Sequence, residues 1–279
     1  MRVTSNSEPI TFRVSQRALA VLEHASAAFF VGVVITFLAL PAVAIIERSI
    51  AKSSLLDAIG SADVRDSLRL SFLTTTTSLI LIVIFGTPTA YVLARRRFPG
   101  RRLLDAIVDL PIVLPPAVGG LGLLMAFGRR GLLGQYLDDL GISLAFTVWA
   151  VIMAQSFVAA PFYIRTAKAG FESIDQELEA VARTLGSSPI GTFWRVSVPL
   201  ARPALMAGAV MAWARALGEF GATIMFAGSL AGKTQTMPLT IYRSLETGLD
   251  VPLALATMLI GISLVVLLIF RSLFQATSV

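Results

Sequence analysis

Few side chains in this sequence could carry covalent chemistry. The chain contains one histidine, His24, and no cysteine, which excludes a thiol nucleophile and leaves no second histidine or cysteine to complete a metal site. It also lacks the G-x-x-x-x-G-K-[ST] loop with which many proteins bind nucleotide phosphates. We therefore predict no catalytic residue, no metal site and an interfacial position for His24.

One charged pair lies inside an apolar stretch. Arg215 and Glu219 fall within residues 204–226, which are apolar enough to cross a membrane, and their spacing of four places them on one face of a helix. Ionisable residues in a membrane span usually face the interior of the bundle or a water-filled cavity. Two roles are open for this pair: a gate or substrate contact, and a structural ion pair within the helix.

Three further residues are candidates for a polar path. Thr75 belongs to a run of four threonines, whose hydroxyls either bond back to helix carbonyls or line a pathway. Thr223 follows Glu219 in the same apolar stretch. Pro115 lies in the sequence LPIVLPPAVGGLGLL, where the prolines cannot all fit a regular helix. Broken helices at membrane depth are tolerated where they pack in protein or line a cavity, so Pro115 marks a candidate path element.

The elements that must position these residues are membrane spans. The chain has 279 residues, of which 56% are hydrophobic, and a mean hydropathy of +0.79. Its repeated apolar runs have the length of about twenty residues that a helix needs to cross a bilayer. We predict an all-α membrane protein with one domain of six transmembrane helices, residues 25–274, after an irregular polar tail, residues 1–24. The expected spans are 25–46, 68–93, 105–127, 143–164, 204–226 and 252–270.

The distribution of positive charge predicts the orientation of these spans. If successive loops lie on alternating sides of the membrane, 14 lysines and arginines fall on the side of the N-terminal tail and eight on the other side. The segment RRRFPGRR (95–102) is the strongest single signal. Cytoplasmic loops carry such an excess, so we expect the N-terminus to be cytoplasmic. The net charge of +6 then reflects this bias and a solvated surface, not nucleic-acid binding.

A polar segment at 173–203 is the longest piece that cannot span a bilayer. Leu178, Val181 and Leu185 recur at helical spacing, and Ser173 with Gln176 has the pattern of a capping box that starts a helix. Gly186 is expected to end this helix. The segment must lie in water or against a partner.

A second short helix is expected to follow. Ser188 and Pro189 have the pattern of an N-cap residue with proline in the first helical position. Pro199 and Pro203 are expected to close the segment. The whole polar loop, about 165–203, would thus consist of two helices separated by a glycine.

This arrangement resembles the EAA loop of ABC importer permeases. The family pattern is Glu-Ala-Ala, three residues, Gly, nine residues and Ile-x-Leu-Pro. Here Ala180-Val181-Ala182, Gly186, Val196 and Val198-Pro199 keep the register, although Ala180 replaces the glutamate and Glu179 lies one position earlier. The resemblance implies a coupling helix that docks on a cytoplasmic ATPase, with candidate coupling residues Glu179, Ala180, Ala182, Arg183, Gly186 and Pro199.

Two other stretches resemble the molybdate, tungstate and sulfate permeases of that family. They are LPIVLPPAVGGLGLL and the series GEFGAT, FAG and TQT between Gly218 and Thr236. The resemblance implies a type I ABC importer permease in the inner membrane, in contact with lipid, that carries a tetrahedral oxyanion. Molybdate is closest, with sulfate, thiosulfate or tungstate as alternatives. It also implies a separate ATPase subunit that binds ATP and Mg, an extracytoplasmic oxyanion-binding protein and a second permease copy that forms a homodimer with this chain. It implies no cofactor in this chain.

Two other classes of function compete with this interpretation. An intramembrane enzyme would need a nucleophile and base or a metal constellation, which one histidine without cysteine does not supply. An ion channel would have no reason to carry a polar two-helix loop with permease spacing. Both therefore rank below a transport subunit.

Overall fold

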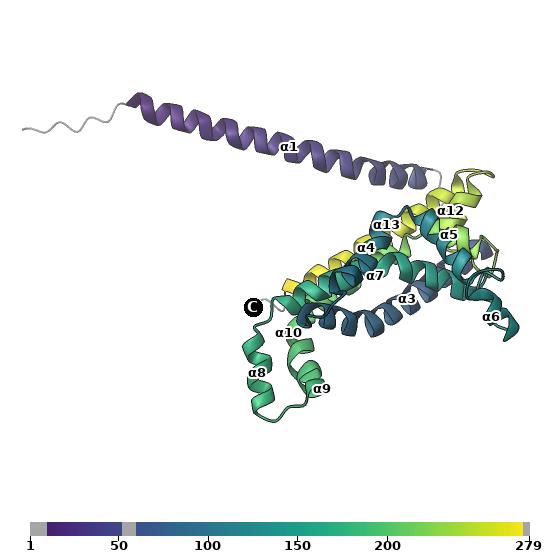
Figure 1. Ribbon diagram of the computed structural model, residues 1–279. Helices are drawn as coiled ribbons and strands as arrows, with labels where there is room; N and C mark the ends of the chain where they lie inside the picture. Colours follow the sequence, from purple (N-terminus) through teal and green to yellow (C-terminus); the bar gives the residue numbers. More distant parts are fainter. Residues whose placement is uncertain (1–9, 52–59, 276–279) are drawn as a thin grey trace, which may run out of the picture.

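The computed structural model describes residues 10–51 and 60–275, and every regular element in these ranges is a helix (Figure 1). Five helices are long and apolar enough to cross a membrane, and a bent pair of helices provides a sixth span. The five lie in α1 (Ile10–Ala51), α3 (Ala62–Arg95), α7 (Val148–Glu172), the continuous helix Pro189–Leu217 and α13 (Asp250–Gln275). The all-α architecture and the six predicted spans are thus confirmed.

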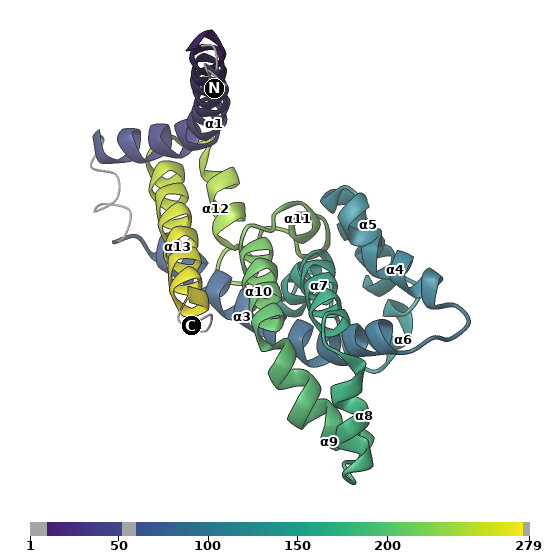
Figure 2. The ribbon, with the colours of Figure 1, turned by 90° about the vertical axis from the view of Figure 1, so that its left-hand side faces the viewer.

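The first helix is longer than the sequence indicated. It begins at Ile10, so residues 10–24, expected to be irregular, are helical, while residues 1–9 lie outside the described part of the chain. Over most of its length α1 lies apart from the other helices (Figures 1 and 2), and it packs against α13. Its apolar side chains from Phe29 to Leu40 are correspondingly exposed.

Helices α3, α7 and α10 (Val198–Leu217) form the centre of the bundle. Tyr163 of α7 lies between Gly86 of α3 and Gly208 of α10. A Cβ atom on Gly86 would come within 2.9 Å of the Tyr163 ring, and one on Gly208 within 3.1 Å of the Tyr163 carbonyl oxygen. The Tyr163 hydroxyl shares a hydrogen bond of 2.6 Å with Thr87. Small residues allow this close approach, which is how membrane helices associate when apolar burial alone does not drive them together.

The third predicted span, 105–127, is broken, as its prolines and glycines indicated. Helices α4 (Arg101–Val113) and α5 (Pro116–Phe127) meet at an angle of 117°. Three ion pairs hold α4 against α7: Asp105 with Lys168 at 2.7 Å, Asp109 with Arg165 at 2.8 Å, and Arg101 with Glu172 at 3.4 Å.

Short helices complete the fold. Helix α6 (Gly134–Asp139) follows α5, and α12 (Met237–Ser244) lies in a region that the sequence indicated to be a loop. The amide of Met237 donates to the Ser71 hydroxyl at 2.8 Å, which anchors α12 to α3. At the opposite end of the bundle, α8 (Gln176–Thr184) and α9 (Pro189–Thr192) project together beyond the spans (Figures 1 and 2). We call residues 173–197 the docking loop.

Candidate functional site

The docking loop is shaped by local capping. Asp175 is the N-cap of α8, and its side chain accepts a hydrogen bond of 2.9 Å from the Glu177 amide. Gly186 has a φ of +90°, which places it in the left-handed region that ends helices. Ser188 then caps α9 by accepting from the Gly191 amide at 3.0 Å. The predicted glycine break and second N-cap are confirmed.

The predicted capping box at Ser173 is wrong. The Ser173 hydroxyl donates to the Gly170 carbonyl at 2.8 Å and so belongs to the end of α7, which leaves Asp175 to start α8. The expected proline stop is wrong as well. Pro199 lies in the first turn of α10 and Pro203 lies inside it.

A π-helical turn, Phe193–Ser197, explains why Pro199 does not end the helix. The Val198 amide bonds to the Phe193 carbonyl, five residues back, and the helix therefore continues into α10 without a break. Proline lacks an amide hydrogen, so Pro199 cannot donate to the preceding turn, and the π-helical turn lies at this point of the helix.

Glu179 is the buried centre of the docking loop. Its side chain is 3% exposed and accepts from Arg95 at 3.1 Å, from Ser197 at 2.9 Å and from Tyr91 at 3.3 Å. Arg183 lies within 3.9 Å of the same carboxylate and donates to the Glu179 carbonyl at 3.1 Å. One carboxylate therefore joins α8 to the end of α3 and to the π-helical turn.

Aromatic rings lie at the base of the docking loop. Tyr91 packs edge-on against Phe171 and Phe193, with ring centroids 5.3 Å and 4.9 Å apart. Edge-to-face pairs of this kind add stability beyond the area they bury. Together with Glu179, they fix the position of the loop relative to α3 and α7.

The outer surface of the docking loop is apolar. Leu185 is 83% exposed and Ile190 is 73% exposed, and further large apolar side chains accompany them: Leu178, Val181 and Trp194. Ala180 and Arg183 are also exposed, and Ala182 is half-buried. Exposed apolar groups gathered on a projecting element are typical of a surface that contacts a partner.

A second break in the spans lies between Arg215 and Glu219. The sequence had indicated that the two residues share one helix face. Helix α10 ends at Leu217, however, and α11 (Gly221–Ala227) begins after it, so they do not. They nevertheless form an ion pair of 2.7 Å, with Glu219 1% exposed. The other oxygen of Glu219 accepts from the Ala222 amide at 2.7 Å, which caps α11.

The two breaks lie against each other. A Cβ atom on Gly120 of α5 would come within 2.5 Å of the Ala222 carbonyl oxygen, and one on Gly221 within 3.0 Å of Pro116. Pro115, which precedes α5, and Thr223, which is buried in α11, thus belong to adjoining elements. Within the described residues the Thr223 hydroxyl has no hydrogen-bond partner.

Thr75 belongs to a different part of the structure. It is fully buried between α3 and α7, where the Gln155 amide donates to its hydroxyl at 3.4 Å. Ser78 in turn donates to Gln155 at 3.1 Å. The sequence reading missed Gln155, although an amide in an apolar stretch was a signal that could have identified it.

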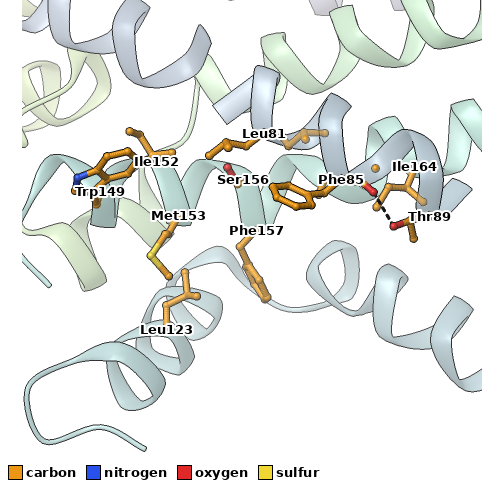
Figure 3. Close-up of a pocket in the computed structure, with 13 residues that line it drawn as sticks. Leu81, Phe85, Thr89, Leu123, Trp149, Ile152, Met153, Ser156, Phe157 and Ile164 are labelled. Carbon is orange, nitrogen blue, oxygen red and sulfur yellow. Dashed lines mark hydrogen bonds between the residues drawn. The ribbon is translucent and has the colours of Figure 1, made fainter. Parts of the chain in front are cut away.

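A groove of about 440 Å³ opens between α3, α5 and α7 (Figure 3). Trp149, Met153 and Phe157 of α7, Phe85 of α3 and Leu123 of α5 contribute most of its walls. None of the residues that line it is charged, and the Thr89 hydroxyl donates to the Phe85 carbonyl at 2.7 Å. An oxyanion would find no cation there, so this groove suits an apolar occupant.

The chain has six spans, two of which are broken at points that lie against each other, and a two-helix loop that projects beyond the spans. Together these features define a polytopic transport subunit. Comparison with protein families agrees: residues 82–278 match the model of the binding-protein-dependent transport system inner membrane component. The chain belongs to this family of inner-membrane transport proteins, whose members are permease subunits and not catalytic enzymes.

Named relatives lie within the same family. The chain is 43% identical over 234 residues to the molybdenum transport system permease protein ModB of Mycobacterium tuberculosis, covering 84% of this chain and 88% of the relative. It is 38% identical to the sulfate transport system permease protein CysW of Synechococcus elongatus, with 78% and 76% covered.

Solved structures share the fold. A bacterial ABC transporter involved in the import of the acidic polysaccharide alginate matches with a TM-score of 0.71 and 16% identity, covering 97% of this chain and 99% of that chain. A structure of a bacterial alginate ABC transporter in complex with a pentasaccharide-bound periplasmic protein matches with a TM-score of 0.68 and 15% identity, with 95% of each chain covered. The fold is therefore that of a type I ABC importer permease.

Proposed function

We propose that this chain is the membrane subunit of an importer that carries a tetrahedral oxyanion, molybdate in the first place, into the cytoplasm. The observation that carries this proposal is the 43% identity to a molybdenum permease over 84% of the chain. Sulfate is the second candidate, because a sulfate permease is 38% identical over a similar range. Thiosulfate and tungstate fall in the same chemical class.

The docking loop supports a role for a separate ATPase subunit. Its exposed apolar side chains, Leu185 and Ile190 above all, fit the groove of a partner in the way that amphipathic helices do. ATP and Mg would bind to that partner. In this proposal the loop, the N-terminus and the C-terminus are cytoplasmic, in accord with the arginine-rich turn that precedes α4.

The remaining partners follow from the family and its relatives. An extracytoplasmic protein would deliver the oxyanion; in support, a solved alginate transporter is in complex with a periplasmic protein that has an alginate pentasaccharide bound. A second copy of this chain would complete the path. The candidate path residues are those at the helix breaks, where Arg215 is the cation nearest to Glu219 and the buried Thr223 hydroxyl is free to bond.

Uptake of labelled oxyanions tests this proposal. Cells that lack only this gene are compared with cells that carry it on a plasmid, with labelled molybdate and labelled sulfate at low external concentration. Loss of molybdate uptake alone supports the first candidate, and loss of sulfate uptake alone supports the second. Retention of both would contradict the oxyanion assignment and leave the family membership intact.

A further inference from the structure

A second groove lies between α3 and α4, beside the arginine-rich turn. It has a volume of about 430 Å³ and is lined by Pro88, Thr89, Val92 and Leu93 of α3 and by Leu104 and Val108 of α4. The Thr89 hydroxyl is already bonded to the Phe85 carbonyl. The groove therefore offers a hydrocarbon surface without a free polar group.

One end of this groove meets five arginines. Helix α3 ends at Arg95, two residues after Leu93, and α4 begins at Arg101, three residues before Leu104. The connecting turn, RRRFPGRR, therefore lies next to the end of the groove that Leu93 and Leu104 line. The apolar groove between the two helices is therefore adjacent to a positively charged turn, which lies where the helices leave the membrane.

The five arginines are not equivalent. Arg95 is buried and paired with Glu179, and Arg101 contacts both Glu172 at 3.4 Å and Asp105 at 3.9 Å. Arg96, Arg97 and Arg102 are exposed, and none has a carboxylate within 4.0 Å in the described part of the chain. Three guanidinium groups are left to be neutralised from outside the chain.

Nearby acidic residues do not supply that neutralisation. Asp105 is bound to Lys168 at 2.7 Å and Asp109 to Arg165 at 2.8 Å, so both carboxylates of α4 are engaged with α7. A ligand for the turn must therefore bring its own negative charge. A ligand for the groove must bring an apolar chain.

We propose that this groove is a binding site for an anionic phospholipid, with an acyl chain between α3 and α4 and its phosphate at Arg96, Arg97 and Arg102. Basic clusters next to membrane helices attract anionic headgroups, and guanidinium groups bind phosphate through paired hydrogen bonds. A free oxyanion fits the turn but not the apolar groove, and a zwitterionic lipid fits the groove but not the charge of the turn. The proposal requires only that the chain spans a membrane and does not depend on the transported substrate.

Native mass spectrometry of retained lipid tests the site. The full chain, co-expressed with its partner subunits, is purified and equilibrated with an equimolar mixture of phosphatidylglycerol and phosphatidylcholine. The wild type is expected to retain phosphatidylglycerol preferentially. In the double variant Arg96→Gln, Arg97→Gln, the ratio of retained phosphatidylglycerol to phosphatidylcholine is expected to fall roughly tenfold, because two charges next to the headgroup are removed. Arg96→Lys with Arg97→Lys is expected to keep most of it.

Matched variants exclude a general effect of charge or misfolding. Arg129→Gln with Arg130→Gln removes two arginines outside the turn and is expected to leave the preference unchanged. Val92→Phe with Leu104→Phe, which fills the groove while keeping every arginine, is expected to lower retention of phosphatidylglycerol. Thermal unfolding of each variant identifies any that fail to fold, and Arg102→Gln alone then replaces the double variant.

Three outcomes, besides the competition control described last, would overturn the proposal. They are equal retention of the two lipids by the wild type, equal losses in the Arg96/Arg97 and Arg129/Arg130 variants, and displacement of the lipid by inorganic phosphate or sulfate. The last result would assign the turn to a free oxyanion. Competition by soluble glycerol phosphate is the corresponding control for a headgroup that binds without its acyl chain, and effective competition would likewise contradict the site.

Discussion

Arg95 at the end of α3 and Glu179 in α8 form an ion pair that is almost entirely buried, with 3.1 Å between Nε and Oε1 and exposures of 7% and 3%. Arg95 also donates to the Ile174 carbonyl at 2.9 Å, at the start of the docking loop. The pair is thus a fixed connection between that loop and the second membrane span. Breaking a buried pair is far more costly than exchanging it for apolar groups, because one charge is left behind without a partner.

Replacement of Glu179 by alanine is expected to destabilise the docking loop by about 3–5 kcal/mol, since it leaves Arg95 buried and unpaired. Thermal unfolding and limited proteolysis of the loop measure this effect. Glu177→Ala, two residues earlier on the exposed face of α8, is the control and should change little. A Glu179→Ala variant as stable and as protease-resistant as the wild type would contradict the role assigned to this pair.

Replacement of Gly186 by valine is expected to uncouple ATP hydrolysis from uptake while membrane insertion persists. Its φ of +90° costs a residue with a side chain about 1–2 kcal/mol, whereas nothing lies within 4 Å of a new Cβ atom. Gly141→Val provides a matched control, because Gly141 has a φ of +75° and equally open surroundings outside the docking loop. Undiminished transport in the Gly186→Val variant would count against a coupling role for the loop.

Replacement of Gly120 by alanine is expected to separate the two helix breaks. The new Cβ atom would meet the Ala222 carbonyl oxygen at 2.5 Å, and overpacking of this kind costs about 1–3 kcal/mol. Gly122→Ala in the same helix is the control, since a Cβ atom there has nothing within 4 Å. Thermal unfolding and uptake should both distinguish the two variants, and indistinguishable behaviour would show that α5 and α11 are free to move apart.

Replacement of Glu219 by glutamine is expected to impair uptake, whichever of its two roles holds, because Arg215 loses its partner at 2.7 Å. The double variant Arg215→Met, Glu219→Gln separates the roles, because it removes both charges together while the glutamine oxygen can still accept from the Ala222 amide. If the pair is structural, stability and uptake should recover in the double variant. If it is part of the path, stability should recover while uptake stays low.

Local features of the fold were predictable from the sequence. Prolines and glycines act on the backbone within a few residues, so the break between α4 and α5, the turn at Gly186 and the cap at Ser188 could be located in advance. Apolar runs of membrane length also identified the spans, because such a run is a property of consecutive residues. The cap at Asp175 was missed because two neighbouring residues, Ser173 and Asp175, both have side chains that can cap.

Contacts between distant segments were not predictable in this way. Tyr91 and Arg95 lie more than 80 residues from Glu179 in the chain, and Arg95 was indistinguishable from its neighbours in an arginine-rich turn. The break after Leu217 was hidden because residues 204–226 are apolar apart from Arg215 and Glu219, whose spacing suits a continuous helix, and Gly218 is compatible with a helix. Pro199 was misinterpreted because the helix continues through the π-helical turn that precedes it, and Pro203 was misinterpreted because it lies inside α10, where a proline usually ends a helix.

The helix from Pro189 to Leu217 connects the two parts of the candidate site mechanically. Its 29 residues form one continuous helix, about 43 Å long at 1.5 Å per residue, which includes the π-helical turn and the two prolines. The apolar surface around Ile190 lies at one end, and the Arg215–Glu219 pair lies at the other. A displacement applied at Pro189 therefore reaches the helix break at Gly218 without crossing a non-helical segment, and the π-helical turn and the two prolines between them set how stiffly the helix transmits it.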